Sequence, residues 1–189
     1  MDHDHKLEEK YEGLLPDAII FAFNAHSGQY RKLSPQQYII HPLRVSEFLL
    51  KNFSHHSNIN EMRIAAVLHD TVEDTWASIK DIEKEFGNKI ARIVFEVSKP
   101  EGKDKKEIHI KYLELLKNSS DEAKIIKLAD IFDNAILSTD NNPKWKSFLL
   151  ESKETLELSE LKKEDKIYET IKRETLKIIN KKLKDMKTA

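Results

Sequence analysis

The stretch "AAVLHDTVEDT", from Ala65 to Thr75, ends an apolar run in a histidine and three carboxylates: His69, Asp70, Glu73 and Asp74. An imidazole and a carboxylate together suit a transition-metal ion such as Mn, Fe, Co, Ni or Zn. Neighbouring residues on a helix point about 100° apart, but at a helix end both side chains can reach a cation that lies beyond the end. The pattern is therefore compatible with a metal site at His69 and Asp70, although two residues alone do not establish one. A surface pair of the same two residues is the alternative.

His41 and Asp130 are two further residues whose settings suit such a site. His41 follows the apolar run "YII" and precedes a proline that opens a helix, so we expect it near the core as a ligand or as a helix cap. Asp130 lies in the strongly apolar segment "IIKLADIFDNA", where an unpaired charge would cost several kcal/mol. Lys127 is one candidate partner for it. Asp133 and Asn134 share a helix face with Asp130, however, and a polar strip on an apolar helix indicates the lining of a site.

Helices are the elements expected to position these residues. The four glycines and five prolines are few for 189 residues, which disfavours a turn-rich β fold. The first helix is predicted to begin near Pro16. Ser78 and Asp81 form a predicted capping box, and Gly87 stands where a left-handed residue ends a helix. Apolar periodicity predicts helices over residues 16–26, 42–53, 61–70, 78–87, 88–98, 105–118, 121–139, 144–161 and 165–186. The predicted fold class is all-α, a single bundle of about eight to ten helices without a strand.

Length and composition limit the classes of protein to which the chain can belong. It has 189 residues, 39% hydrophobic and 34% charged, which favours one globular domain with a sizeable core. We predict a polar lead over residues 1–15, a core over 16–140 and C-terminal helices over 141–189 that pack on that core. The formal net charge of −1 provides no basic field, so no nucleic-acid partner is expected.

Cysteine content and hydropathy bear on location. Because there is no cysteine, disulfides and cysteine-based zinc sites are excluded, and a cytoplasmic location is expected. The start "MDHDHKLEEKYEG" is too polar for a signal peptide. The longest apolar run, about "AIIFAF", is far shorter than the roughly 20 residues that span a bilayer. No membrane partner is therefore expected.

Four motifs occur in order between Ala25 and Asn134: "AHSGQYRK", "YIIHP", "AAVLHDTVEDT" and "KLADIFDN". In this order they resemble the HD-domain superfamily of metal-dependent phosphohydrolases, especially the hydrolase domain of RelA/SpoT-type proteins and the small stand-alone alarmone hydrolases. The resemblance implies an HD domain that holds a divalent metal ion, typically Mn²⁺. The ligands that it implies are His41, His69, Asp70 and Asp130. The resemblance covers most of the chain and fades after about residue 140.

The resemblance also implies a reaction, the release of the 3′-pyrophosphate of a (p)ppGpp-like nucleotide by attack of a metal-bound hydroxide. Glu73 and Asp74 match the family's acidic pair, which positions or deprotonates the water and protonates the leaving oxygen. Arg31 and Lys32 match a basic pair that lies against the nucleotide base, and Asn134 matches an asparagine near the sugar or the metal. The alternatives are an acidic helix exit and a basic pair that are simply solvated.

The match to the (p)ppGpp hydrolases departs at Ile131, Asp133 and Ile136, where those enzymes carry Lys or Arg, His or Tyr, and Arg. Fewer cations and an added acid weaken the binding of a highly phosphorylated ligand. A less phosphorylated nucleotide is therefore an alternative substrate, and a catalytically silent HD module that binds a nucleotide is another reading. Self-association into a homo-oligomer through the charged C-terminal helices is a further alternative.

Overall fold

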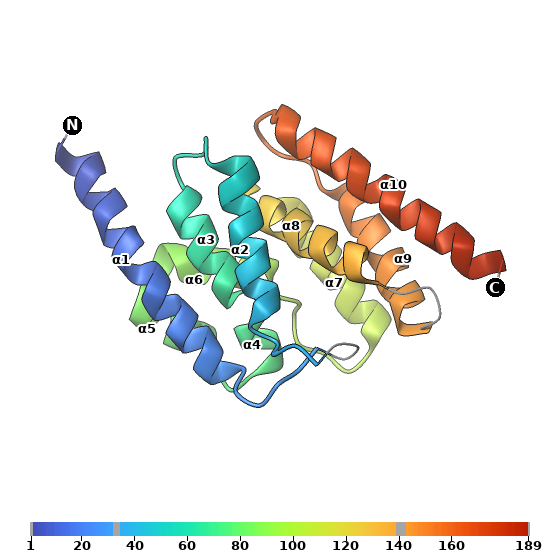
Figure 1. Ribbon diagram of the computed structural model, residues 1–189, viewed down its shortest axis with the longest axis horizontal. Coiled ribbons are helices and arrows are strands. Elements are labelled where there is room, and N and C mark those ends of the chain that lie inside the picture. The colour runs from blue at the N-terminus through green and yellow to red at the C-terminus, as the bar shows by residue number, and fades with distance from the viewer. Residues whose placement is uncertain (1, 32–34, 139–142, 189) are drawn as a thin grey trace. The chain divides into compact units, whose positions relative to one another are not determined.

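The computed structural model describes residues 2–31, 35–138 and 143–188, and over these ranges the chain is built from helices (Figure 1). Ten helices occur in the described part, with no strand; one isolated β-bridge joins Tyr30 and Gln37 in a loop. The prediction of an all-α fold is confirmed. The helices are α1 Asp2–Ala25, α2 Ile40–Phe53, α3 Ile59–Leu68, α4 Thr71–Asp74, α5 Ile79–Phe86, α6 Asn88–Val97, α7 Lys105–Asn118, α8 Asp121–Leu137, α9 Pro143–Leu158 and α10 Lys166–Thr188.

The first helix is longer than the sequence predicts. It begins at Asp2 and contains Pro16 in its interior, whereas the prediction placed its start near that proline. A proline suits the first helical turn, which is why the sequence predicts a start at this residue. The segment "KLEEK" before it consists of strong helix formers, which favour continuation of the helix across the proline.

The first compact unit, Met1–Ser98, is arranged around α3. This helix contacts α1, α2 and α6 (Figure 1). Its side chains Met62, Ile64 and Leu68 are fully buried, which confirms the prediction of a largely buried helix. Because α3 packs on three sides, the position of its C-terminal end, where His69 follows, is well determined by the core of this unit.

The predicted capping box is present at the start of α5. The hydroxyl of Ser78 accepts a hydrogen bond from the backbone N–H of Asp81 at 3.3 Å, and the Asp81 carboxylate accepts one from the Ser78 N–H at 2.9 Å. Gly87, with φ of 87°, occupies the left-handed region between α5 and α6, as predicted. These residues turn the chain so that α5 and α6 pack together in the first unit.

The second compact unit, Lys99–Ala189, contains α7 to α10. In it α10 packs against α8 and α9, and α9 also contacts α7. Ile125, Ile126 and Leu128 on α8 are fully buried, so this helix is fixed by an apolar face. The two units divide after Ser98, and the predicted boundaries at residues 15 and 140 stay a prediction.

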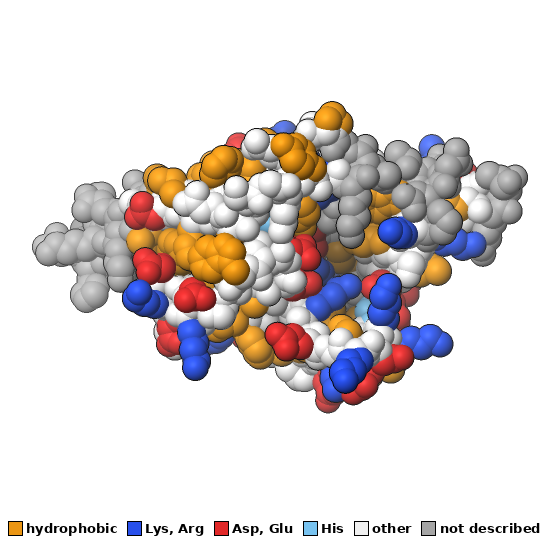
Figure 2. All heavy atoms as spheres, turned by 90° about the horizontal axis from the view of Figure 1, so that it is seen from below, with side chains coloured by type: hydrophobic (Ala, Val, Ile, Leu, Met, Phe, Trp, Pro, Cys, Tyr) orange, Lys and Arg blue, Asp and Glu red, His pale blue; other side chains and the backbone are white. Residues whose placement is uncertain are grey.

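The distribution of charge on the surface and the hydropathy of the helices agree with the mixed composition of the chain. No helix in the described part of the chain is long and apolar enough to cross a membrane. Figure 2 shows acidic and basic side chains interspersed with hydrophobic ones over the part of this face that is not grey. In the described part of this face, no extended surface of one charge is visible.

Candidate active site

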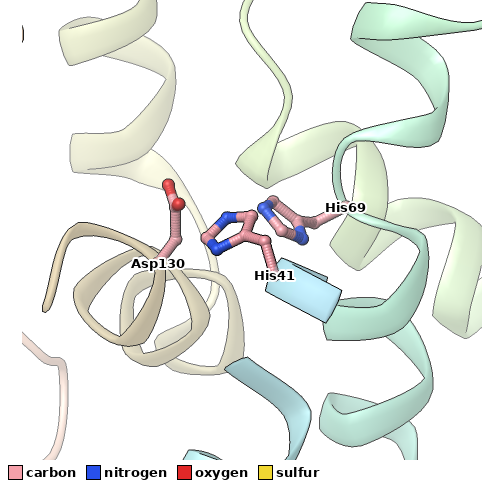
Figure 3. A group of neighbouring side chains, drawn as sticks. All are labelled: His41, His69 and Asp130. Carbon is pink, nitrogen blue, oxygen red and sulfur yellow. The ribbon is translucent and has the colours of Figure 1, made fainter. Parts of the chain in front are cut away.

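His41 and His69 lie together in the first unit. His41 is the second residue of α2 and His69 directly follows α3; both are buried, and the two helices pack against each other. Their rings stand edge to face with centroids 5.3 Å apart. Figure 3 shows the two side chains next to each other. The start of one helix and the end of another thus bring two imidazoles to one point.

The hydrogen bonds of His69 define which nitrogen carries the proton. Nδ1 lies 2.7 Å from the carbonyl oxygen of Ala66, an acceptor, so the Nδ1–H donates to it. Nε2 then presents a lone pair toward Oδ2 of Asp70 at 3.0 Å. An imidazole nitrogen and a carboxylate oxygen at this distance suit a cation that both could bind. A donor bond from the second ring nitrogen to a backbone carbonyl is also typical of histidines that bind metals.

The carboxylate of Asp70 lies close to the other side chains of this group. Its Oδ2 lies 3.0 Å from Nε2 of His69 and 3.7 Å from Nε2 of His41. The hydroxyl of Tyr38 donates to the same oxygen at 2.6 Å. Three of the four predicted metal ligands therefore converge within the first unit.

Glu73 and Asp74 form the end of the four-residue helix α4, and both are exposed. Oδ2 of Asp74 lies 3.4 Å from the Tyr38 hydroxyl, and its backbone carbonyl accepts a hydrogen bond from Nε2 of Gln29 at 2.8 Å. Asp74 is thus tied to the segment before α2 through both its side chain and its backbone. Its carboxylate shares the Tyr38 hydroxyl with Asp70, so Asp74 stands next to the candidate ligands.

Asp130 belongs to the second unit, on α8, and is the third side chain drawn in Figure 3. It is buried, as are His41 and His69. Nζ of Lys127 lies 2.9 Å from its Oδ2, so the alternative partner considered from the sequence is present. Nδ2 of Asn134 donates to its Oδ1 at 2.6 Å, which agrees with the predicted polar strip on one helix face.

The residues predicted to contact a nucleotide are described in part. The guanidinium carbon of Arg31 lies 5.9 Å from the ring centroid of Tyr38, within the range of a cation–π contact. Lys32 lies outside the described residues. Asn134 is placed by its bond to Asp130 on α8.

Tyr38 and Gln29 are site residues that the sequence reasoning missed. Both lie between α1 and α2, and the Tyr38 ring stacks on His26 with centroids 4.7 Å apart. His26 in turn donates from Nδ1 to Oε1 of Gln29 at 2.9 Å, so it supports the segment that carries both residues. A signal for Tyr38 was available: it stands three residues before His41 in "YIIHP".

Comparison with known proteins assigns the family. Residues 18–140 match the family described as HD domain. The chain belongs to the HD domain family. The match includes every residue predicted as a metal ligand or acid, and the resemblance found in the sequence motifs is confirmed.

Relatives of this HD domain occur in animals and bacteria. The chain is 39% identical over 121 residues to guanosine-3′,5′-bis(diphosphate) 3′-pyrophosphohydrolase MESH1 of Xenopus tropicalis. The aligned region covers 62% of this chain and 65% of that protein. It is 35% identical over 135 residues to guanosine-3′,5′-bis(diphosphate) 3′-pyrophosphohydrolase of Aquifex aeolicus, covering 70% of this chain and 18% of that protein. The match thus spans less than two thirds of the length of each of these two relatives.

A solved structure shares the fold of this HD domain. It is described as "A metazoan ortholog of SpoT hydrolyzes ppGpp and plays a role in starvation responses", and the TM-score is 0.74 at 28% identity. The alignment covers 89% of this chain and 96% of that one. The likeness therefore extends over nearly the whole chain, including helices after residue 140.

The departures from the (p)ppGpp hydrolase pattern lie in this HD domain at positions of different exposure. Ile131 is buried, with 1% of its surface accessible, whereas Ile136 is 49% exposed. Asp133 is partly exposed. An apolar side chain at 131 therefore belongs to the core, while the side chain at 136 is open to solvent or to a ligand.

Proposed function

We propose that this chain is a metal-dependent phosphohydrolase that removes the 3′-pyrophosphate of a (p)ppGpp-like guanosine nucleotide. The observation that carries the proposal is the convergence of His41, His69 and Asp70 beside Asp74 in an HD domain. Relatives named guanosine-3′,5′-bis(diphosphate) 3′-pyrophosphohydrolase support the substrate class.

The proposed cofactor is a divalent cation, Mn²⁺, with His41, His69, Asp70 and Asp130 as its ligands. Two imidazoles and two carboxylates suit such an ion. The close approach of His69 Nε2 and Asp70 Oδ2, 3.0 Å, supports a positive centre at this point. When bound, the ion lowers the pKa of water and polarises a phosphoryl oxygen.

The reaction assigned to the site is a displacement at phosphorus. Water attacks the phosphorus atom next to the ribose 3′ oxygen, the bond between this phosphorus and the 3′ oxygen breaks, and pyrophosphate leaves. Glu73 and Asp74 take up the proton of the attacking water and return a proton to the 3′ oxygen. Their exposure on α4 supports this role, because a substrate can approach them.

The nucleotide is held in this proposal by Arg31, Lys32 and Asn134. A guanidinium can stack on a purine, and Arg31 already lies against an aromatic ring, that of Tyr38. The partner is therefore a small-molecule nucleotide, and a cytoplasmic location is part of the proposal, since nucleotide pools are found there.

A second candidate function is hydrolysis of a nucleotide with fewer phosphates. Ile131 and Ile136 replace cationic residues, and Asp133 adds a negative charge on the same helix. The missing cation at the exposed position 136 and the added acid at 133 disfavour a ligand that carries several negative charges.

The deciding experiment is a nucleotide panel with Mn²⁺-loaded protein, in which released pyrophosphate and orthophosphate are identified separately. We expect the wild-type protein to release pyrophosphate from guanosine tetraphosphate, and we expect the Asp74→Asn variant to release none. If guanosine tetraphosphate is untouched while the protein retains stoichiometric Mn²⁺, the substrate assignment is wrong. Turnover of a less phosphorylated member of the panel would then favour the second candidate.

A further inference from the structure

The hydroxyl of Tyr38 contacts two carboxylates to which the proposed function gives different roles. It donates to Oδ2 of Asp70 at 2.6 Å and lies 3.4 Å from Oδ2 of Asp74. We infer, on the basis of the proposed function, that Tyr38 is a positioning residue that couples the metal ligand Asp70 to the proton-transfer residue Asp74.

The Tyr38 ring is held in place from several sides, all within the first unit. It stacks on His26 at 4.7 Å and meets His41 edge to face at 6.1 Å. Its backbone N–H donates to the carbonyl of Gln29 at 3.0 Å. A ring and a backbone that are both fixed leave the hydroxyl oxygen in a defined position, which is the condition for organising a site before a ligand arrives.

The bond from Tyr38 orients the Asp70 carboxylate. At 2.6 Å it is short, as expected for a hydroxyl that donates to an ionised carboxylate. The oxygen that accepts it is the one that also faces His69 and His41. Partners of this kind keep a ligand carboxylate aligned, and their loss weakens metal binding by roughly 10- to 100-fold.

The same hydroxyl lies within reach of the carboxylates of both Asp70 and Asp74. A phenol has one proton, which Tyr38 gives to Asp70, and its rotation can bring that proton toward Asp74. Gln29 supports the arrangement by donating to the Asp74 carbonyl at 2.8 Å. Removal of one oxygen atom therefore acts on two properties, the affinity for the cation and the rate of the chemical step.

Tyr38→Phe tests this role because it keeps the ring and deletes only the hydroxyl. Tyr168→Phe is the matched control, since it deletes a buried hydroxyl that bonds Ser159 on the second unit. Mn²⁺ dissociation constants are measured by titration calorimetry on the full chain, and pyrophosphate release from guanosine tetraphosphate is measured at saturating Mn²⁺. We expect the Mn²⁺ dissociation constant of Tyr38→Phe to rise by roughly 10- to 100-fold. Its kcat should also fall while KM for the nucleotide stays unchanged, and Tyr168→Phe should show neither effect.

Each part of the inferred role can be overturned separately. Wild-type Mn²⁺ affinity in Tyr38→Phe would contradict the support of Asp70, and wild-type kcat at saturating Mn²⁺ would contradict the link to Asp74. An equal loss of Mn²⁺ affinity in Tyr168→Phe would show that the loss in Tyr38→Phe reflects lower general stability. This result would overturn the positioning role. If the wild-type chain releases no pyrophosphate, the proposed function fails, and the calorimetric comparison alone then decides on Tyr38.

Discussion

Lys127 Nζ lies 2.9 Å from Oδ2 of Asp130, and both side chains are largely buried, with 13% and 8% of their surfaces accessible. The two residues are one turn apart on α8. A buried carboxylate needs a compensating positive charge. Lys127 supplies one from the same helix, and in the proposed function a divalent cation supplies another.

Lys127→Met is therefore expected to destabilise the metal-free chain more than the Mn²⁺-loaded chain. Without the ammonium group the Asp130 carboxylate loses its partner, at a cost of about 3 kcal/mol in the free energy of unfolding. A cation bound to Asp130 would replace part of the lost charge. Urea unfolding with and without Mn²⁺ measures both values, and Lys111→Met, at an exposed pair with Glu107, is the control with little expected change. An equal loss under both conditions would speak against Asp130 as a ligand.

His69→Ala is expected to lower the Mn²⁺ content of the purified protein well below that of the wild type. The substitution removes an imidazole whose Nδ1 is bonded to the Ala66 carbonyl, so in the proposed function Nε2 is the atom that would bind the cation. His109→Ala is the matched control, because His109 pairs with Glu154 in the second unit. Elemental analysis after gel filtration gives the content, in a background in which His3 and His5 are alanine so that they cannot chelate. Unchanged content in His69→Ala would reject the metal site.

The parts of the fold that the sequence predicted well depend on local rules. The capping box at Ser78 and Asp81 and the left-handed Gly87 need only neighbours in the chain. His69 and Asp70 were recognisable because they end an apolar helix. The start of α1 was wrong because one local rule, proline in the first turn, was outweighed by the helix propensity of the residues before Pro16.

The contacts around Tyr38 could not be predicted, because they depend on packing. Tyr38 and Asp70 are 32 positions apart and meet only because α2 and α3 lie against each other. In the sequence, a tyrosine beside an apolar run predicts a core residue. Its hydroxyl acquires a role only when the carboxylates on the facing segment are known, and Gln29 reaches Asp74 across 45 positions for the same reason.

Ile136→Arg is expected to shift the nucleotide preference toward more highly phosphorylated substrates. Position 136 is 49% exposed, so a guanidinium can stay solvated until a phosphate binds. One charge-assisted contact raises kcat/KM for guanosine tetraphosphate by roughly 10-fold relative to a nucleotide with fewer phosphates. Ile131→Arg is the comparison. Because the Ile131 side chain is buried, this substitution should lower the free energy of unfolding rather than shift the nucleotide preference. An unchanged ratio of kcat/KM values for Ile136→Arg would remove this residue from the determinants of specificity.

Tyr168 makes the stability of the second unit depend on pH in the alkaline range. Burial raises the pKa of its hydroxyl from the ordinary 10.0 to about 12; the bond with Ser159 acts in the opposite direction, and the charges of Glu169 and Asp121 add to the increase. Below pH 10 the phenol is neutral in both the folded and the unfolded chain, and its contribution to stability is complete. Between pH 10 and 12 the unfolded chain loses this proton while the folded chain keeps it, so stability falls as pH rises.

The expected loss from this one residue is about 2–3 kcal/mol in the free energy of unfolding across that interval. Tyr168→Phe has no phenol to ionise, so its urea midpoint should decline less steeply between pH 9 and pH 11 than that of the wild type. Lysines titrate in both proteins, and the difference between the two slopes isolates Tyr168. At neutral pH the variant should be less stable by about 1 kcal/mol, because the hydrogen bond with Ser159 is lost. Parallel declines in the two proteins would show that the Tyr168 hydroxyl ionises alike in the folded and unfolded states.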